Sequence, residues 1–147
     1  FANQYLAYER LPDDLRKRIE GRMLLHDESR LNDGSLRKGH AEVTDPREAT
    51  GAQHRIVRTH PETRRKALYL GRRRNAYVIG LPLEESEALL DALWAQATQP
   101  ELVWTHQWQP GDTLIWDNRC LVHRQDMGGA GEGWLIHRVQ IRGEVPR

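Results

Sequence analysis

The sequence has few cysteines, no long apolar run and almost no net charge, and each shortage excludes a class of protein. Its 147 residues include one cysteine, Cys120, which excludes an internal disulfide framework and a zinc site built from cysteines. No apolar run approaches the ~20 residues that cross a bilayer, and no secretory segment opens the chain. The formal net charge of +1 provides no electrostatic attraction to nucleic acid or to an acidic membrane. We therefore expect a cytoplasmic protein without nucleic-acid or membrane partners.

The overall amino-acid composition is typical of a single folded domain. Hydrophobic residues make up 38% of the chain and charged residues 29%, a balance typical of globular proteins. The length suits one domain better than two. The chain opens at Phe1 rather than at Met, which is consistent with a piece of a longer protein. Two arginine-rich stretches, at 64–66 and 72–74, are interpreted as solvated turns rather than as a polyanion-binding patch.

Hydrophobic periodicity predicts helices at the start and in the middle of the chain. Apolar residues at helical spacing, with acidic residues just after Pro12, predict a helical region that runs to about residue 25. A second helix, at about 83–98, has glutamates in its first turn and an apolar stripe along one side. Residues 26–53 are polar, rich in turn residues and without a period. We interpret them as a mobile lid.

Short strands separated by glycine and proline turns are predicted for most of the rest. They lie at about 56–59, 67–70, 76–79, 103–108, 113–116, 121–123 and 134–141. Several short strands around one helix favour an α+β or mainly β fold with an incomplete jelly-roll core and flanking helices. The tryptophans are interpreted as core residues rather than as a binding cage: Trp94, Trp104, Trp108, Trp116 and Trp134.

Two residues near the C-terminal end are the candidates for chemistry. His123 follows a strand and a polar turn, where it could supply one imidazole to a non-haem iron site built from two histidines and a carboxylate. Taken alone, a histidine in this position is more often a structural residue. Arg138 lies fifteen residues later on the last predicted strand, between apolar neighbours. Its guanidinium suits a carboxylate or sulfonate ligand, and the alternative is a rim arginine paired with an acidic side chain.

Blocks of sequence along the chain resemble, in order and spacing, the taurine dioxygenase (TauD/TfdA) family of iron(II)- and 2-oxoglutarate-dependent dioxygenases. The blocks are Arg-Thr-His-Pro at 58–61, Lys-Ala-Leu-Tyr-Leu at 66–70, Glu-Glu-Ser-Glu-Ala-Leu-Leu at 84–90, Trp-Gln-Pro-Gly-Asp at 108–112, Ile-Trp-Asp-Asn-Arg at 115–119 and His-Arg at 137–138. The resemblance extends from about Tyr5 to Gly143. The block that precedes His123 is fairly specific, whereas the Pro-Gly-Asp turn alone is not.

The resemblance implies an enzyme and gives a role to each candidate residue. It places His123 at the family's second iron-binding histidine, and Arg138 at the arginine that holds the anionic group of the substrate. It implies Fe(II), the cosubstrate 2-oxoglutarate and O2, with hydroxylation of a small organic anion such as a sulfonate or a carboxylate. Residues 1–147 would then form the C-terminal portion of one such domain, with a double-stranded β-helix core and the lid at about 26–53.

The sequence departs from the family in two places. It contains no His-x-Asp pair, which in the family supplies the other histidine and the carboxylate. The nearest substitute is the pair His40 and Glu42 in the predicted lid. The arginine expected to bind the far carboxylate of 2-oxoglutarate is replaced by Trp134, which cannot form a charge-assisted pair. Arg119 and Arg124 are alternatives without positional support.

Three hypotheses about function remain open at this point. The chain is part of an active dioxygenase, or it is a catalytically inactive remnant that serves as a scaffold or assembly partner, or another polypeptide or upstream segment supplies the missing ligands. Four further histidines have no second potential metal ligand at a useful spacing, and we interpret them as structural or surface residues: His54, His60, His106 and His137. An incomplete barrel exposes sheet edges and apolar faces, so we expect a homo-oligomer.

Overall fold

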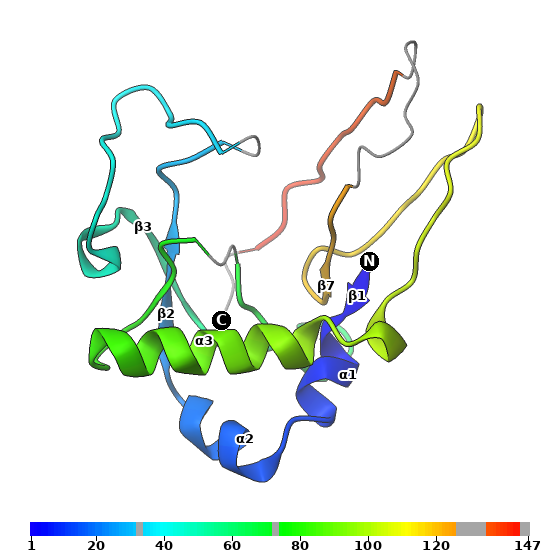
Figure 1. The fold of residues 1–147 in the computed structure, drawn as a ribbon. Coiled ribbons are helices and arrows are strands. Elements are labelled where there is room, and N and C mark those ends of the chain that lie inside the picture. Colours follow the sequence, from blue (N-terminus) through cyan, green and yellow to red (C-terminus); the bar gives the residue numbers. More distant parts are fainter. Residues whose placement is uncertain (32–33, 72–73, 126–134, 145–147) are drawn as a thin grey trace.

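The computed structural model describes residues 1–31, 34–71, 74–125 and 135–144, and these form a mixed arrangement of helices and small sheets (Figure 1). The α-helices are α1 (Gln4–Glu9), α2 (Asp13–Ile19) and α3 (Leu83–Ala97), and two 3-10 helices are η1 (Pro46–Glu48) and η2 (Pro100–Leu102). The strands are β1 (Ala2–Asn3), β2 (Met23–Asp27), β3 (Gly51–Arg55), β4 (Val57–Thr59), β5 (Lys66–Leu68), β6 (Tyr77–Val78) and β7 (Leu121–Val122). In the described ranges no helix is long and apolar enough to cross a membrane.

The helices follow local sequence signals. The side chain of Asn3 caps α1 by accepting hydrogen bonds from the backbone N–H groups at positions 5 and 6. The predicted helix at 83–98 is confirmed as α3. The prediction that the first helical region continues to residue 25 is wrong, because α2 ends at Ile19 and β2 follows. Gly21, with a φ of +70°, takes the left-handed conformation that ends many helices.

Within the described ranges the strands form three antiparallel sheets. The largest has the order β3-β2-β6, with β2 in the centre, and β4 pairs with β5 in a hairpin. In the third sheet β1 pairs with β7, so that the start of the chain lies beside residue 121. The described strands do not close into a barrel.

The segment interpreted as a lid is narrower than predicted. Its two ends belong to β2 and β3, whose register runs from Met23 opposite Arg55 to Asp27 opposite Gly51. Residues between these strands include η1 and one isolated bridge, from Arg30 to Leu36. The sequence of β3 shows no alternation of apolar and polar residues, because this strand is short and largely exposed on both faces. The mobility of the remaining loop stays a prediction.

The core lies between α3 and the sheets. Figure 1 shows α3 crossing in front of β2, and the apolar stripe predicted for this helix is fully buried at Leu89, Leu90 and Leu93. These side chains share one cluster with apolar residues of the first half, including Leu24. Buried Ser86 also ties the helix to β6, because its hydroxyl oxygen accepts a 2.9 Å hydrogen bond from the Val78 N–H. Helix and sheet thus form one packed unit, which we call the body (the described residues of 1–102).

Two further segments extend away from the body in Figure 1, and we call residues 103–117 and 135–144 the arms. No residue of the arms belongs to a named strand, so the strands predicted at 103–108, 113–116 and the described part of 134–141 are wrong. An extended segment becomes a strand only when a neighbour pairs with its backbone, and the arms lack such a neighbour over nearly all their described length. Trp104 is 54% exposed, which contradicts its predicted core position, whereas Trp94 packs against the core. Trp134 lies outside the described residues.

Candidate functional site

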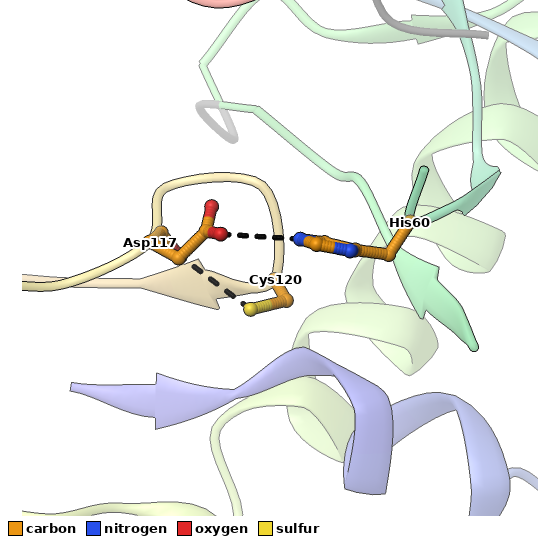
Figure 2. A group of neighbouring side chains, drawn as sticks. All are labelled: His60, Asp117 and Cys120. Atoms are coloured by element: carbon orange, nitrogen blue, oxygen red, sulfur yellow. Dashed lines mark hydrogen bonds and ion pairs between the residues drawn. The ribbon is translucent and has the colours of Figure 1, made fainter. Parts of the chain in front are cut away.

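A hydrogen-bonded network around Asp117 attaches the turn before β7 to the β4–β5 hairpin. The Asp117 carboxylate accepts a 3.1 Å hydrogen bond from Nε2 of His60 (Figure 2) and bonds of 2.7–3.1 Å from the Arg119 guanidinium. Arg119 also donates to Glu62 at 3.0 Å. The hydrogen bonds from Arg119 hold the pKa of Asp117 well below its usual range, and those carboxylates raise the pKa of Arg119. The network therefore joins two segments 57 residues apart in sequence.

The position of the proton on His60 follows from its partners. The ring is 3% exposed, and its Nδ1 accepts hydrogen bonds from the backbone N–H groups of Glu62 and Thr63, at 3.3 and 3.2 Å. A carboxylate can only accept, so the proton on Nε2 is donated to Asp117. This tautomer satisfies every hydrogen bond that the ring makes. The sequence interpretation of His60 as a turn residue at a strand end is confirmed, because β4 ends at Thr59.

His60, Asp117 and Cys120 together have the composition of a metal site, yet their hydrogen bonds favour a structural tie. Their potential ligand atoms all lie within 4.8 Å of one another. A metal would need a free lone pair on the imidazole and a thiolate on the cysteine. The Nδ1 lone pair already accepts two N–H groups, burial raises the pKa of the Cys120 thiol, and its Sγ donates to the Asp117 carbonyl at 3.7 Å (Figure 2).

His123, the predicted iron ligand, directly follows β7 and lies among aromatic rings. Its ring stacks on Phe1 with centroids 5.8 Å apart and contacts the edge of Trp116 at 5.1 Å. Burial, followed by the positive charge of Arg138, lowers the pKa of His123, which keeps a nitrogen lone pair available near neutral pH. His123 is exposed, and it lines an open cavity of about 500 Å³ together with Tyr69 and other residues.

Arg138, the predicted anion-binding residue, contacts the same indole ring as His123, that of Trp116. Its guanidinium carbon lies 5.9 Å from the centre of the Trp116 ring, at cation–π distance. The side chain is exposed, and none of the ion pairs among the described residues includes it. The alternative of a rim arginine neutralised by an acid therefore finds no partner in the described ranges. The two candidate residues of the sequence lie in one neighbourhood.

The substitutes considered for the missing family residues have other partners. Glu42 forms ion pairs with Arg30 and Arg74, and Nδ1 of His40 lies 3.3 Å from the hydroxyl of Thr50. Arg119 is neutralised by the network around Asp117. Arg124 follows His123 and is exposed. These contacts give no support to His40 and Glu42 as a replacement metal pair.

Sequence reasoning missed a second polar cluster, which surrounds Tyr69. The rings of His26 and His54 lie 5.1 and 5.4 Å from the Tyr69 ring, and the Arg58 guanidinium carbon lies 5.1 Å from its centre. Burial and then the charge of His54 lower the pKa of His26 to about 4. The pairing of β2 with β3 brings the two histidines together, and it could not be seen while 26–53 was interpreted as a loop. Arg58 belongs to a block that carries the family resemblance, which was the one available signal.

Residues 1–140 match the family model described as "Taurine catabolism dioxygenase TauD, TfdA family". The chain belongs to this family. It is 37% identical over 152 residues to the (S)-phenoxypropionate/alpha-ketoglutarate-dioxygenase of Sphingobium herbicidovorans, covering 98% of this chain and 52% of that protein. It is 33% identical over 128 residues to the alpha-ketoglutarate-dependent 2,4-dichlorophenoxyacetate dioxygenase of a Burkholderia species, covering 84% and 41%. The predicted resemblance to this family is thus confirmed.

A solved structure supports the same relationship in three dimensions. The chain superposes on AAD-2 in complex with Mn(II) and N-oxalylglycine with a TM-score of 0.57 and 33% sequence identity, covering 74% of this chain and 42% of that one. The TauD/TfdA chain thus spans about half the length of the relatives it matches. The superposition therefore relates this chain to part of that larger structure.

Proposed function

We propose that this TauD/TfdA chain forms part of an iron(II)- and 2-oxoglutarate-dependent dioxygenase that hydroxylates a small organic anion. In this proposal His123 is one metal ligand and Arg138 binds the anionic group of the substrate. The observation that carries it is the shared contact of both residues with Trp116, beside the cavity that His123 lines. The names of the relatives describe oxidations that depend on alpha-ketoglutarate, which favours an enzyme over an inactive scaffold.

The described residues provide one of the three ligands that the proposed metal site needs, namely His123. A non-haem iron centre of this type takes two histidines and a carboxylate. Within the described ranges the one cluster of potential ligands is that of His60, Asp117 and Cys120, whose hydrogen bonds argue against a metal. The other two ligands would therefore come from residues outside those described or from another polypeptide. When bound, the iron would supply O2 activation coupled to decarboxylation of 2-oxoglutarate.

The residues of this chain hold and orient the groups that take part. The Phe1 and Trp116 rings restrict the orientation of the His123 imidazole, and its lowered pKa favours the neutral form that a metal binds. The network around Asp117 fixes the turn that follows Trp116 and leads to β7. The Arg138 guanidinium can bind a carboxylate or sulfonate through two parallel hydrogen bonds.

The proposal also concerns the complete fold. We propose that the arms are strands of a double-stranded β-helix that pair when their neighbours are present. Ile115 is 92% exposed and Ile141 is 96% exposed, and such apolar surface favours association. We therefore expect the isolated chain to form homo-oligomers. Light scattering tests this expectation, and a monomer over a wide concentration range contradicts it.

A succinate assay tests the proposed activity. The chain, and any longer polypeptide that contains it, is supplied with Fe(II), 2-oxoglutarate and O2, with 2,4-dichlorophenoxyacetate, (S)-phenoxypropionate or taurine as substrate. We expect substrate-dependent succinate release that falls at least about a hundredfold in His123→Ala, because a metal ligand is lost. His137→Ala is the matched control, since His137 is also an exposed histidine and lies on the arm at 135–144. Equal activity of the two variants would refute the role of His123.

A further inference from the structure

Arg58 is a buried cation for which the described residues provide no neutralising anion. The side chain is 4% exposed and lies on β4 opposite Ala67. Among the described residues its Nε has no hydrogen-bond partner, and none of their ion pairs includes Arg58. A guanidinium stays charged under all ordinary conditions, and a buried charge is strongly destabilising unless it is paired.

The surroundings of Arg58 add positive character and aromatic surface. The Tyr69 ring faces the guanidinium at 5.1 Å, which is a favourable contact but a weak substitute for a counter-charge. Burial and then the charge of Arg58 lower the pKa of His54, which shows that these two groups lie within electrostatic reach. The carboxylate of Asp117 is already bonded to His60 and Arg119.

A comparison of three arginines shows why Arg58 has the strongest demand for an anion. Arg119 already bonds two carboxylates. Arg138 is exposed, so water solvates its charge. Arg58 has neither compensation, and the Tyr69 ring next to it lines the same cavity as His123. Arg119 lines this cavity and Arg58 does not, but the Tyr69 ring that faces Arg58 does line it, so an acid bound at that ring would lie close to the one buried and unpaired guanidinium of the three.

We propose that Arg58 binds the carboxylate of a small organic acid at the edge of the Tyr69 ring. This inference rests on the proposed function, in which two carboxylates could meet it: that of the cosubstrate 2-oxoglutarate and that of a phenoxyacetate-like substrate. The cosubstrate has the greater need, because Trp134 stands where the resemblance led us to expect its arginine. Arg58 would then supply, from the β4–β5 hairpin, the charge that position 134 lacks.

Ligand titration tests the anion site without turnover. 2-Oxoglutarate and phenoxyacetate are titrated separately into the chain in the presence of EDTA, with heat and the shift of the unfolding midpoint as readouts. We expect saturable binding that weakens about ten- to a hundredfold in Arg58→Met, since a charge-assisted hydrogen-bonded pair is lost. The acid whose affinity falls identifies the source of the carboxylate. Arg55→Met, on exposed Arg55 of the neighbouring strand, is the matched control and should bind as the unchanged chain does.

Stability without ligand gives a second and independent readout. If Arg58 is an unneutralised cation, Arg58→Met unfolds at the same or a higher denaturant concentration than the unchanged chain. A large loss of stability would mean that Arg58 has a structural counter-ion, and it would overturn the inference. Equal binding by Arg58→Met and the unchanged chain, or no saturable binding of either acid, would overturn it as well.

His123→Ala separates this inference from the proposed function. We expect this variant to lose succinate release while it still binds the acid in EDTA. If His123→Ala stays active while Arg58→Met loses binding, the proposed metal role fails and the anion site stands. If His123→Ala is inactive and Arg58→Met binds normally, the proposed function stands and the anion site fails.

Discussion

The body and the arms differ in how their apolar residues are used. In the body Leu90 of α3 is completely buried, whereas in the arms Ile115 and Val139 are each 92% exposed. Both regions contain β-branched and aromatic residues at alternating positions. The body has partners for them, because α3 covers the sheets, while the arms extend away from it (Figure 1). The difference teaches that an alternating pattern predicts an apolar face on a strand, but another part of the protein must pack on that face to bury it.

Hydrogen exchange should show the largest contrast between the two regions. We expect amides of α3 and β2 to exchange at least about a thousandfold more slowly than those of 103–116, a difference of about 4 kcal/mol in opening free energy. Mass spectrometry of peptic fragments measures both regions in one sample. Strong protection of the arms at high protein concentration alone would mean that a second copy covers them. Equal protection of body and arms in dilute solution would contradict the comparison.

Truncation of one apolar side chain in each region should give the next largest effect. Leu90→Ala leaves a cavity in the core and should cost about 3 kcal/mol of unfolding free energy. Ile115→Ala removes a side chain that contacts mainly solvent and should leave the urea midpoint unchanged. A matching loss in both variants would show that the arm is packed in solution.

Acid should weaken the body through His26. Because its pKa is lowered from 6.5 to about 4 on folding, the folded chain binds fewer protons than the unfolded chain between these two values. Stability is therefore complete above pH 6.5 and falls as the pH drops towards 4, by about 2 kcal/mol after allowance for partial solvent exposure. Urea unfolding at pH 7 and pH 4.5 measures the loss. In His26→Gln this part of the pH dependence should be absent, and an unchanged pH profile would refute the assignment.

The smallest expected effect compares two aspartates that each pair with a histidine, one attached to the body and one within an arm. Asp117 joins His60 of the body, whereas Asp112 bonds His106, at 2.8 Å, within one arm. Asp117→Asn weakens a partly screened network and should cost about 1 kcal/mol. Asp112→Asn should not change the unfolding midpoint, because its pair stabilises an exposed turn alone. A reversed order of the two effects would show that the arm contributes more to stability than the network.

The sequence alone was sufficient for the local features of this protein. It placed α3, the tight turn at 110–112 and the strand that precedes His123, because helices and turns depend on residues only a few positions apart. The blocks around 58–61 and 115–119 also identified the family, and with it His123 and Arg138 as candidates. These inferences needed no knowledge of which segments meet in space.

Only the tertiary structure decided which distant residues became partners. The register of β2 and β3 converted the ends of a predicted lid into paired strands, and the contact of His60 with Asp117 crosses 57 positions. Two further features are equally non-local: Arg58 is buried without a counter-ion among the described residues, and the arms are unpaired over nearly all their described length. The physical reason is that strand pairing, ion pairing and burial are satisfied by groups whose sequence separation the local pattern does not encode.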